Sequence, residues 1–146
     1  PSAGRDLVMA RLAAPASGST PFAVSASPAG QGDTLRAVGF GRTKTEWVPD
    51  TAHAASMTVG SVSATELSLT GATANDALCK GDTGAPLLRE TAGGVELQGI
   101  ATRSFQGGCL GVTETRTDAL ATRTDDVAGW IATTVKRSWA LLMTST

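Results

Sequence analysis

Short apolar runs alternate with stretches rich in Gly, Pro, Ser and Thr along most of the chain. The apolar run 7–12 (LVMARL) and the alternating segment 34–41 (TLRAVGFG) each predict a strand. The proline-rich residues between them predict an extended connection. The Val- and Thr-rich segment 55–69 predicts one or two further strands, with a break at Gly60.

The second half of the chain continues the same pattern of short strands and turns. Segments 86–89 and 95–102 flank a Gly-Gly pair that predicts a hairpin turn. Segments 110–117 and 119–124 supply the last predicted β-structure. Most elements are therefore strands, and we expect an all-β fold.

One helix is predicted, at the C-terminal end. Thr124 or Asp125 can cap its first turn, where Asp125 and Asp126 place negative charge. Its apolar positions recur near a period of 3.6 and are Val127, Trp130, Ile131, Val135 and Leu142. We expect this apolar stripe to pack on the β core.

Composition narrows the classes of function. The chain has 146 residues, 12 basic and 13 acidic side chains without long runs, and a net charge of -1. These values predict one compact domain and no binding to nucleic acid or to an anionic membrane. No apolar run approaches the roughly 18 residues of a membrane span. The cysteines are too far apart for a CxxC pair, so neither a metal site nor a cofactor is expected.

Residues 79–86 (CKGDTGAP) form the stretch with the strongest chemical signal. In one hypothesis Thr83 is a nucleophile, and the backbone N–H groups of Gly81 and Thr83 point into an oxyanion hole. In the other, Asp82 is the reactive group, because Asp-Thr-Gly is also the signature of aspartic proteases. The motif alone leaves both hypotheses open.

The surrounding sequence favours the first hypothesis. Residues 81–86 (GDTGAP) resemble the GDSGGP motif of chymotrypsin-like serine proteases, with Thr83 at the serine position. Segments 6–12, 39–41 (GFG), 99–102 (GIAT) and 122–131 also resemble stretches of that family, in the same order. An aspartic protease would have hydrophobic residues before Asp82, and it would need a second Asp-Thr-Gly or a homodimer.

The resemblance implies a domain organisation. Residues 1–12 correspond to the last strand of a first barrel, 13–33 to the interdomain connection, 34–124 to the second six-stranded antiparallel barrel, and 125–143 to the C-terminal helix. Most of the first barrel is absent from this sequence. An N-terminal segment or a second chain is therefore expected to supply it.

The resemblance also implies roles for individual residues. Asp6 takes the position of the catalytic aspartate, Thr83 that of the nucleophile, and Gly81 that of an oxyanion-hole donor. In the family, the carboxylate at the position of Asp82 supports the oxyanion turn by pairing with an N-terminal ammonium. Here Lys80 or another cation would have to replace that ammonium. The resemblance further implies a disulfide, formed by Cys79 and Cys109, which suits a secreted protein.

The positions that correspond to the specificity pocket are unusual for the family. Ala77 falls at the base of the pocket, with Asp76 beside it. Thr102, Ser104 and Ala119 fall on its walls, where the last two replace frequent glycines. These side chains narrow the pocket, which predicts a preference for small residues in a peptide or protein substrate unless Asp76 turns in to bind a basic one.

The catalytic histidine of the family has no counterpart in this sequence. The family places it in a TAAHC-like stretch before the aspartate, but only five residues precede Asp6. His53 lies after the GFG segment, and we interpret it as an exposed or loop histidine. Without a base, and with the extra methyl group of Thr83, this chain alone should be weakly active or inactive. The sequence predicts a serine-type endopeptidase or, alternatively, an inactive pseudoprotease that acts as a secreted binding protein.

Overall fold

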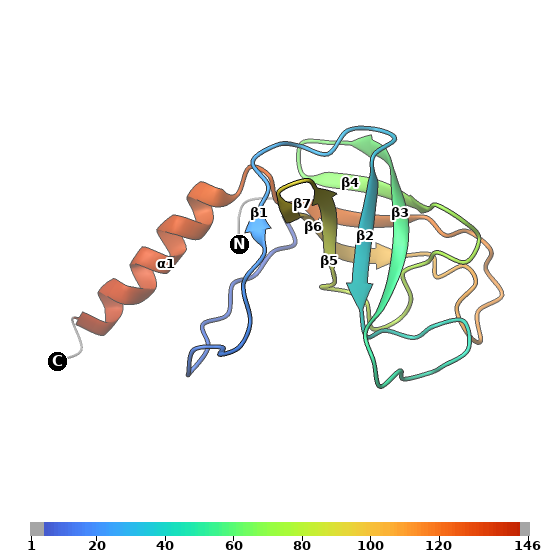
Figure 1. Cartoon of the computed structure of the whole chain (residues 1–146), viewed down its shortest axis with the longest axis horizontal. Coiled ribbons are helices and arrows are strands. Elements are labelled where there is room, and N and C mark those ends of the chain that lie inside the picture. The colour runs from blue at the N-terminus through green and yellow to red at the C-terminus, as the bar shows by residue number, and fades with distance from the viewer. Residues whose placement is uncertain (1–4, 144–146) are drawn as a thin grey trace.

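The computed structural model of the chain describes residues 5–143. Figure 1 shows a barrel of strands from which one helix extends outward. The strands are β1 (Ala23–Val24), β2 (Thr34–Gly39), β3 (His53–Val62), β4 (Glu66–Gly71), β5 (Pro86–Thr91), β6 (Gly94–Ser104) and β7 (Ala119–Arg123), and the helix is α1 (Ala128–Met143).

The barrel is closed and antiparallel. Its strands follow the order β6-β5-β2-β3-β4-β7, and pairing of β6 with β7 closes the ring. The short strand β1 pairs in parallel with β6 outside the ring. This architecture confirms the predicted all-β fold, with a second-barrel arrangement of six strands and a C-terminal helix.

The barrel interior is filled by side chains that alternate with outward-facing ones along β2, β3 and β4. The largest of the buried apolar side chains are each at most 1% exposed: Leu35, Met57, Leu67, Leu69 and Leu87. Burial of one such side chain contributes about 1.5–3 kcal/mol. These side chains form one core cluster together with smaller alanine and valine residues.

Three of the predicted β elements differ in the structure. Segment 7–12 forms no strand, and Val8 is 90% exposed. The described residues provide no neighbouring strand for its backbone hydrogen bonds. Segment 110–117 also forms no strand. Between β3 and β4 the chain turns at residues 63–65, whereas Gly60 marks a bulge where the register shifts.

The start of the helix also differs, because the acidic residues expected in its first turn bind arginines instead. Asp126 accepts two hydrogen bonds from Arg5, at 2.5 and 2.6 Å. Asp125 accepts two from Arg123, at 2.8 and 3.0 Å. The helix begins later, at Ala128.

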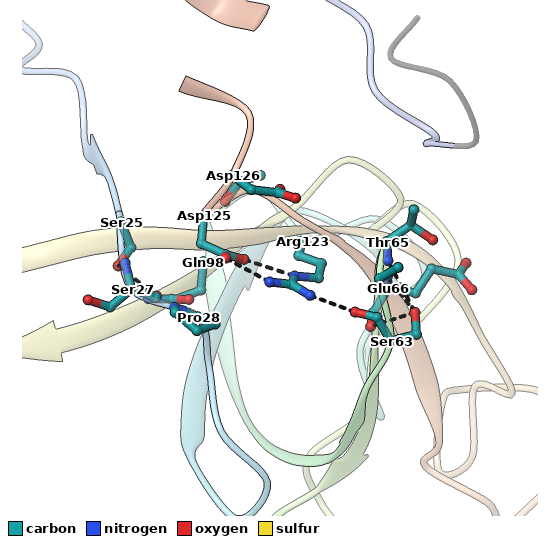
Figure 2. A network of polar contacts seen from close by, with 12 residues as sticks. Ser25, Ser27, Pro28, Ser63, Thr65, Glu66, Gln98, Arg123, Asp125 and Asp126 are labelled. Atoms are coloured by element: carbon teal, nitrogen blue, oxygen red, sulfur yellow. Dashed lines mark hydrogen bonds and ion pairs between the residues drawn. The ribbon is translucent and has the colours of Figure 1, made fainter. Parts of the chain in front are cut away.

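Figure 2 shows how Arg123 connects two parts of the barrel rim. Besides Asp125, its guanidinium donates to the carbonyl of Ser63 at 2.6 Å, in the turn between β3 and β4. Its backbone N–H donates to the carbonyl of Thr65 at 3.0 Å. The segment that leads into the helix is thereby fixed to the barrel.

Over residues 128–136, whose side chains the structure describes, the helix does not pack on the β core, contrary to the expectation from its apolar stripe. The stripe position Leu142 lies outside these residues. The helix projects away from the barrel (Figure 1). Val127, just before it, is 4% exposed, whereas Val135 is 41% exposed. Across residues 5–143, no helix combines the length and hydropathy needed to cross a membrane.

Candidate active site

Residues 79–85 form a tight turn between the disulfide and β5. The N–H of Asp82 donates to the carbonyl of Cys79 at 3.0 Å, and the N–H of Ala85 donates to the carbonyl of Asp82 at 2.9 Å. Thr83 lies exposed on this turn, while the Asp82 side chain points inward and is 2% exposed. We call residues 79–85 the nucleophile turn.

The Asp82 carboxylate is held by two backbone donors. Its Oδ1 accepts from the N–H of Gly41 at 2.8 Å, and its Oδ2 accepts from the N–H of Cys79 at 2.9 Å. A buried carboxylate is stable only when such donors or charges replace water. The side chain therefore links the nucleophile turn to the segment after β2.

Glycines make this close approach possible. A Cβ atom on Gly41 would lie 2.5 Å from Cγ of Asp82, and one on Gly39 would lie 2.1 Å from its Oδ1. Gly81 has a φ of +102°, and a Cβ there would lie 2.9 Å from Cα of Gly41. The GFG segment and the Gly-Asp pair thus fit together as one unit.

His53 is closer to this unit than the sequence predicted. It begins β3 opposite Gly39, and its side chain is 26% exposed. Its Nε2 lies 2.8 Å from the carbonyl oxygen of Gly41 and 3.8 Å from Oδ1 of Asp82. The interpretation as an exposed or loop histidine is therefore wrong. Pairing the GFG segment with the next predicted strand in the sequence could have placed His53 beside Gly39.

The backbone of the nucleophile turn is fixed to β6 and leaves two donors unused. The N–H of Gly84 donates to the carbonyl of Ala101 at 2.8 Å, and the N–H of Ala101 donates to the carbonyl of Ala85 at 2.9 Å. Within residues 5–143, the N–H groups of Gly81 and Thr83 have no hydrogen-bond acceptor. Both residues are exposed, so these donors can bind an oxyanion.

Asp6 is not assembled with the turn in this chain. It is exposed, and its backbone carbonyl accepts a 3.4 Å hydrogen bond from Oγ1 of Thr122. No hydrogen bond or ion pair among the described residues joins Asp6 to Thr83. The nucleophile and aspartate positions therefore lie on separate elements without direct contact.

Cys79 and Cys109 form the disulfide that the resemblance implied, with their Cα atoms 5.9 Å apart. The bond fixes the start of the nucleophile turn to the loop after β6. Closing this loop stabilises the fold by about 3–4 kcal/mol on the chain-entropy model. In the part of the chain that the structure describes, no group of three His, Cys, Asp or Glu residues could hold a metal ion.

Asp76 is held away from the expected pocket base at Ala77. Its Oδ1 accepts from the N–H of Ser56 at 2.8 Å, and its Oδ2 accepts from the hydroxyl of Thr73 at 2.6 Å. The hydrogen bond from the Thr73 hydroxyl is the main cause that lowers the pKa of Asp76, and the Ser56 N–H adds to it. The carboxylate is thus engaged with the preceding loop and β3.

Ser104, at one expected pocket wall, is hydrogen-bonded to the segment that contains Ala77. The hydroxyl of Ser104 donates a short hydrogen bond to the carbonyl of Leu78, between Ala77 and the disulfide. Ser104 pairs with buried Ala119 across β6 and β7, and the Thr102 hydroxyl donates to the carbonyl of Leu120 at 3.0 Å.

A basic cavity of about 280 Å³ lies beside the nucleophile turn. Ala77 and Cys79 line it together with three basic side chains, Arg42, Lys44 and His53. The Arg42 guanidinium stacks 4.2 Å from the ring centre of Trp47 and donates to the carbonyl of Leu110 at 3.1 Å.

Comparisons with known proteins agree with this geometry. A family model described as Trypsin matches residues 1–131. Among solved structures, the chain is similar to neuropsin, a serine protease expressed in the limbic system of mouse brain, with a TM-score of 0.62 and 19% sequence identity. The match covers 80% of this chain and 54% of that one, so the chain spans about half the length of neuropsin. No curated protein matches the sequence.

Proposed function

Because the chain belongs to the trypsin family of serine proteases, we propose that it is the C-terminal portion of a secreted endopeptidase that hydrolyses peptide bonds through an acyl-enzyme. One observation carries this proposal. Residues 79–85 form a tight turn with the Asp82 side chain buried, and the N–H groups of Gly81 and Thr83 have no acceptor among residues 5–143. The disulfide supports export to an oxidising compartment.

The proposed reaction divides the work between two barrels. An N-terminal segment or partner chain supplies the first barrel and a histidine, and Asp6 orients that histidine. As Oγ1 of Thr83 attacks the substrate carbonyl, the histidine takes the proton of the Thr83 hydroxyl. The N–H groups of Gly81 and Thr83 stabilise the oxyanion that forms. The peptide C–N bond then breaks, the histidine protonates the leaving amine, and water hydrolyses the ester at Thr83.

The substrate would be a peptide or protein cut after a small residue. Ala77 provides no charge for a basic side chain, and Asp76 is engaged by Ser56 and Thr73. Ser104 and Ala119 narrow the space between the walls. An Arg or Lys side chain of a substrate would therefore find no free carboxylate at the base of the pocket.

A second candidate function is supported by the same region. The Thr83 methyl group restricts χ1 and crowds the place where base and substrate carbonyl must meet. The hydrogen bond from the Ser104 hydroxyl to the Leu78 carbonyl ties one expected pocket wall to the segment that contains the expected pocket base at Ala77. A catalytically inactive pseudoprotease that binds a partner protein would have no need of an open pocket.

Cleavage of a mixed peptide library by the protein joined to its N-terminal segment distinguishes the two functions. The proposal predicts new termini after small residues, about tenfold to a hundredfold more product with Thr83→Ser, and none with Thr83→Ala. If neither the natural protein nor Thr83→Ser cuts any peptide, the endopeptidase proposal is wrong and the binding protein is favoured.

A further inference from the structure

The buried carboxylate of Asp82 lies near one side chain that can carry a positive charge, that of His53. A buried carboxylate is strongly stabilised by a nearby positive charge. Lys80 is exposed and makes no ion pair with Asp82, whereas Nε2 of His53 lies 3.8 Å from its Oδ1. We propose that protonated His53 is a positioning residue, which neutralises Asp82 and thereby holds the nucleophile turn in place.

Hydrogen-bond chemistry fixes how the histidine would carry its charge. The carbonyl of Gly41 can only accept a hydrogen bond, so Nε2 of His53 donates to it at 2.8 Å in either charge state. The second proton therefore binds Nδ1 and adds a charge without breaking this bond. The N–H of Gly41 donates to the same Asp82 oxygen, so one residue connects both side chains.

Burial makes the charge interaction stronger than that of a surface pair. The Asp82 side chain is 2% exposed and that of His53 is 26% exposed, so water screens their attraction only in part. Arg42 and Lys44 line the same cavity as His53 and would repel a positive charge on the ring. Asp82 lies 3.8 Å from Nε2 of the ring, and its negative charge attracts a positively charged imidazole.

The register between β2 and β3 determines where the His53 ring lies. His53 is paired with Gly39 across β2 and β3, so the strand register places the ring beside Asp82. The nucleophile turn is then supported by a side chain of the barrel, and its support increases as the solution becomes acidic. This role deepens the proposed function and rests on it, since a nucleophile turn serves a peptidase site.

The test uses the 146-residue chain with its disulfide intact and measures no activity. His53→Gln retains an N–H donor for the Gly41 carbonyl but cannot carry charge, and Lys80→Gln is the control that removes an exposed charge from the same turn. Urea unfolding is followed at pH 5, where an imidazole is largely protonated, and at pH 8, where it is neutral. Amide exchange of Cys79, whose N–H binds Asp82, reports on the turn itself.

At pH 5, His53→Gln should raise the unfolding equilibrium constant about fivefold and speed Cys79 exchange by a similar factor. At pH 8 it should match the natural chain, and Lys80→Gln should match it at both pH values. In an Asp82→Asn background, His53→Gln should have no effect at pH 5. If His53→Gln is as stable as the natural chain at pH 5, or if it loses as much stability at pH 8 as at pH 5, the charge has no role and the proposal is overturned. Either result leaves the peptidase proposal untouched.

Discussion

Gly41 is the position where one added methyl group should separate the nucleophile turn from the barrel. In Gly41→Ala the new Cβ would lie 2.5 Å from Cγ of Asp82 and 2.7 Å from its backbone nitrogen. Both distances are far below van der Waals contact, and the backbone nitrogen cannot rotate away as a flexible side chain could. Either the turn or the segment after β2 must therefore move.

Two costs add to the expected destabilisation. Displacement breaks the 2.8 Å hydrogen bond from the Gly41 N–H to a buried carboxylate, which costs about 1.5–3 kcal/mol. Forcing a methyl group into a packed site costs about 1–3 kcal/mol more. We expect Gly41→Ala to lower the free energy of unfolding by about 2.5–6 kcal/mol.

Urea unfolding followed by tryptophan fluorescence measures this loss. Gly93→Ala is the matched control, because a Cβ there would meet only the Thr91 hydroxyl, at 3.9 Å. It should lie within about 0.5 kcal/mol of the natural chain. If Gly41→Ala is as stable as Gly93→Ala, the close packing of Asp82 against the GFG segment is refuted.

Three further predictions concern the disulfide, the barrel rim and the nucleophile. Reduction should add 2 Da to the intact mass as the Cys79–Cys109 bond opens and should lower stability by about 3–4 kcal/mol, measured by urea unfolding with and without reductant. Because hydrogen bonds from Arg123 lower the pKa of Asp125, the ionised carboxylate stabilises the fold above the ordinary Asp range near pH 4, and this contribution is lost as pH falls through the lowered pKa. Asp125→Asn should therefore cost about 1–3 kcal/mol at pH 7 and nothing at the acid limit, and an equal cost at both pH values would contradict the pairing. In the protein joined to its first barrel, Thr83→Ser should raise peptide hydrolysis about tenfold or more, and an unchanged rate would show that the methyl group does not hinder attack.

The sequence predicted strands because strands follow a local rule, whereas the closed barrel was implied by the resemblance to a known family. Alternation of apolar residues marked the inward positions of β2, and the motif around Asp82 and Thr83 resembled one known turn. Strand 7–12 and the docking of the helix were not found in the structure. Both depend on a neighbouring surface, and an apolar pattern shows only that a segment can be buried.

His53 shows the limit of the sequence for the site. Its neighbours suggested an exposed or loop position, and its contact with Asp82 depends on the register between β2 and β3. Likewise, the hydrogen bond of Ser104 to the Leu78 carbonyl joins two segments whose separation no local pattern gives. The positions of His53 and Ser104 in the site depend on pairing between distant segments, which local sequence patterns do not predict.

The most direct test of the account is fluorophosphonate labelling of Thr83→Ser in the protein joined to its N-terminal segment, followed by peptide mass spectrometry. A formed nucleophile turn with a supplied histidine predicts one adduct, on residue 83, and its loss when Gly41→Ala is added. The absence of any adduct on residue 83 in the folded protein would contradict the claim that this barrel carries the nucleophile turn of a peptidase.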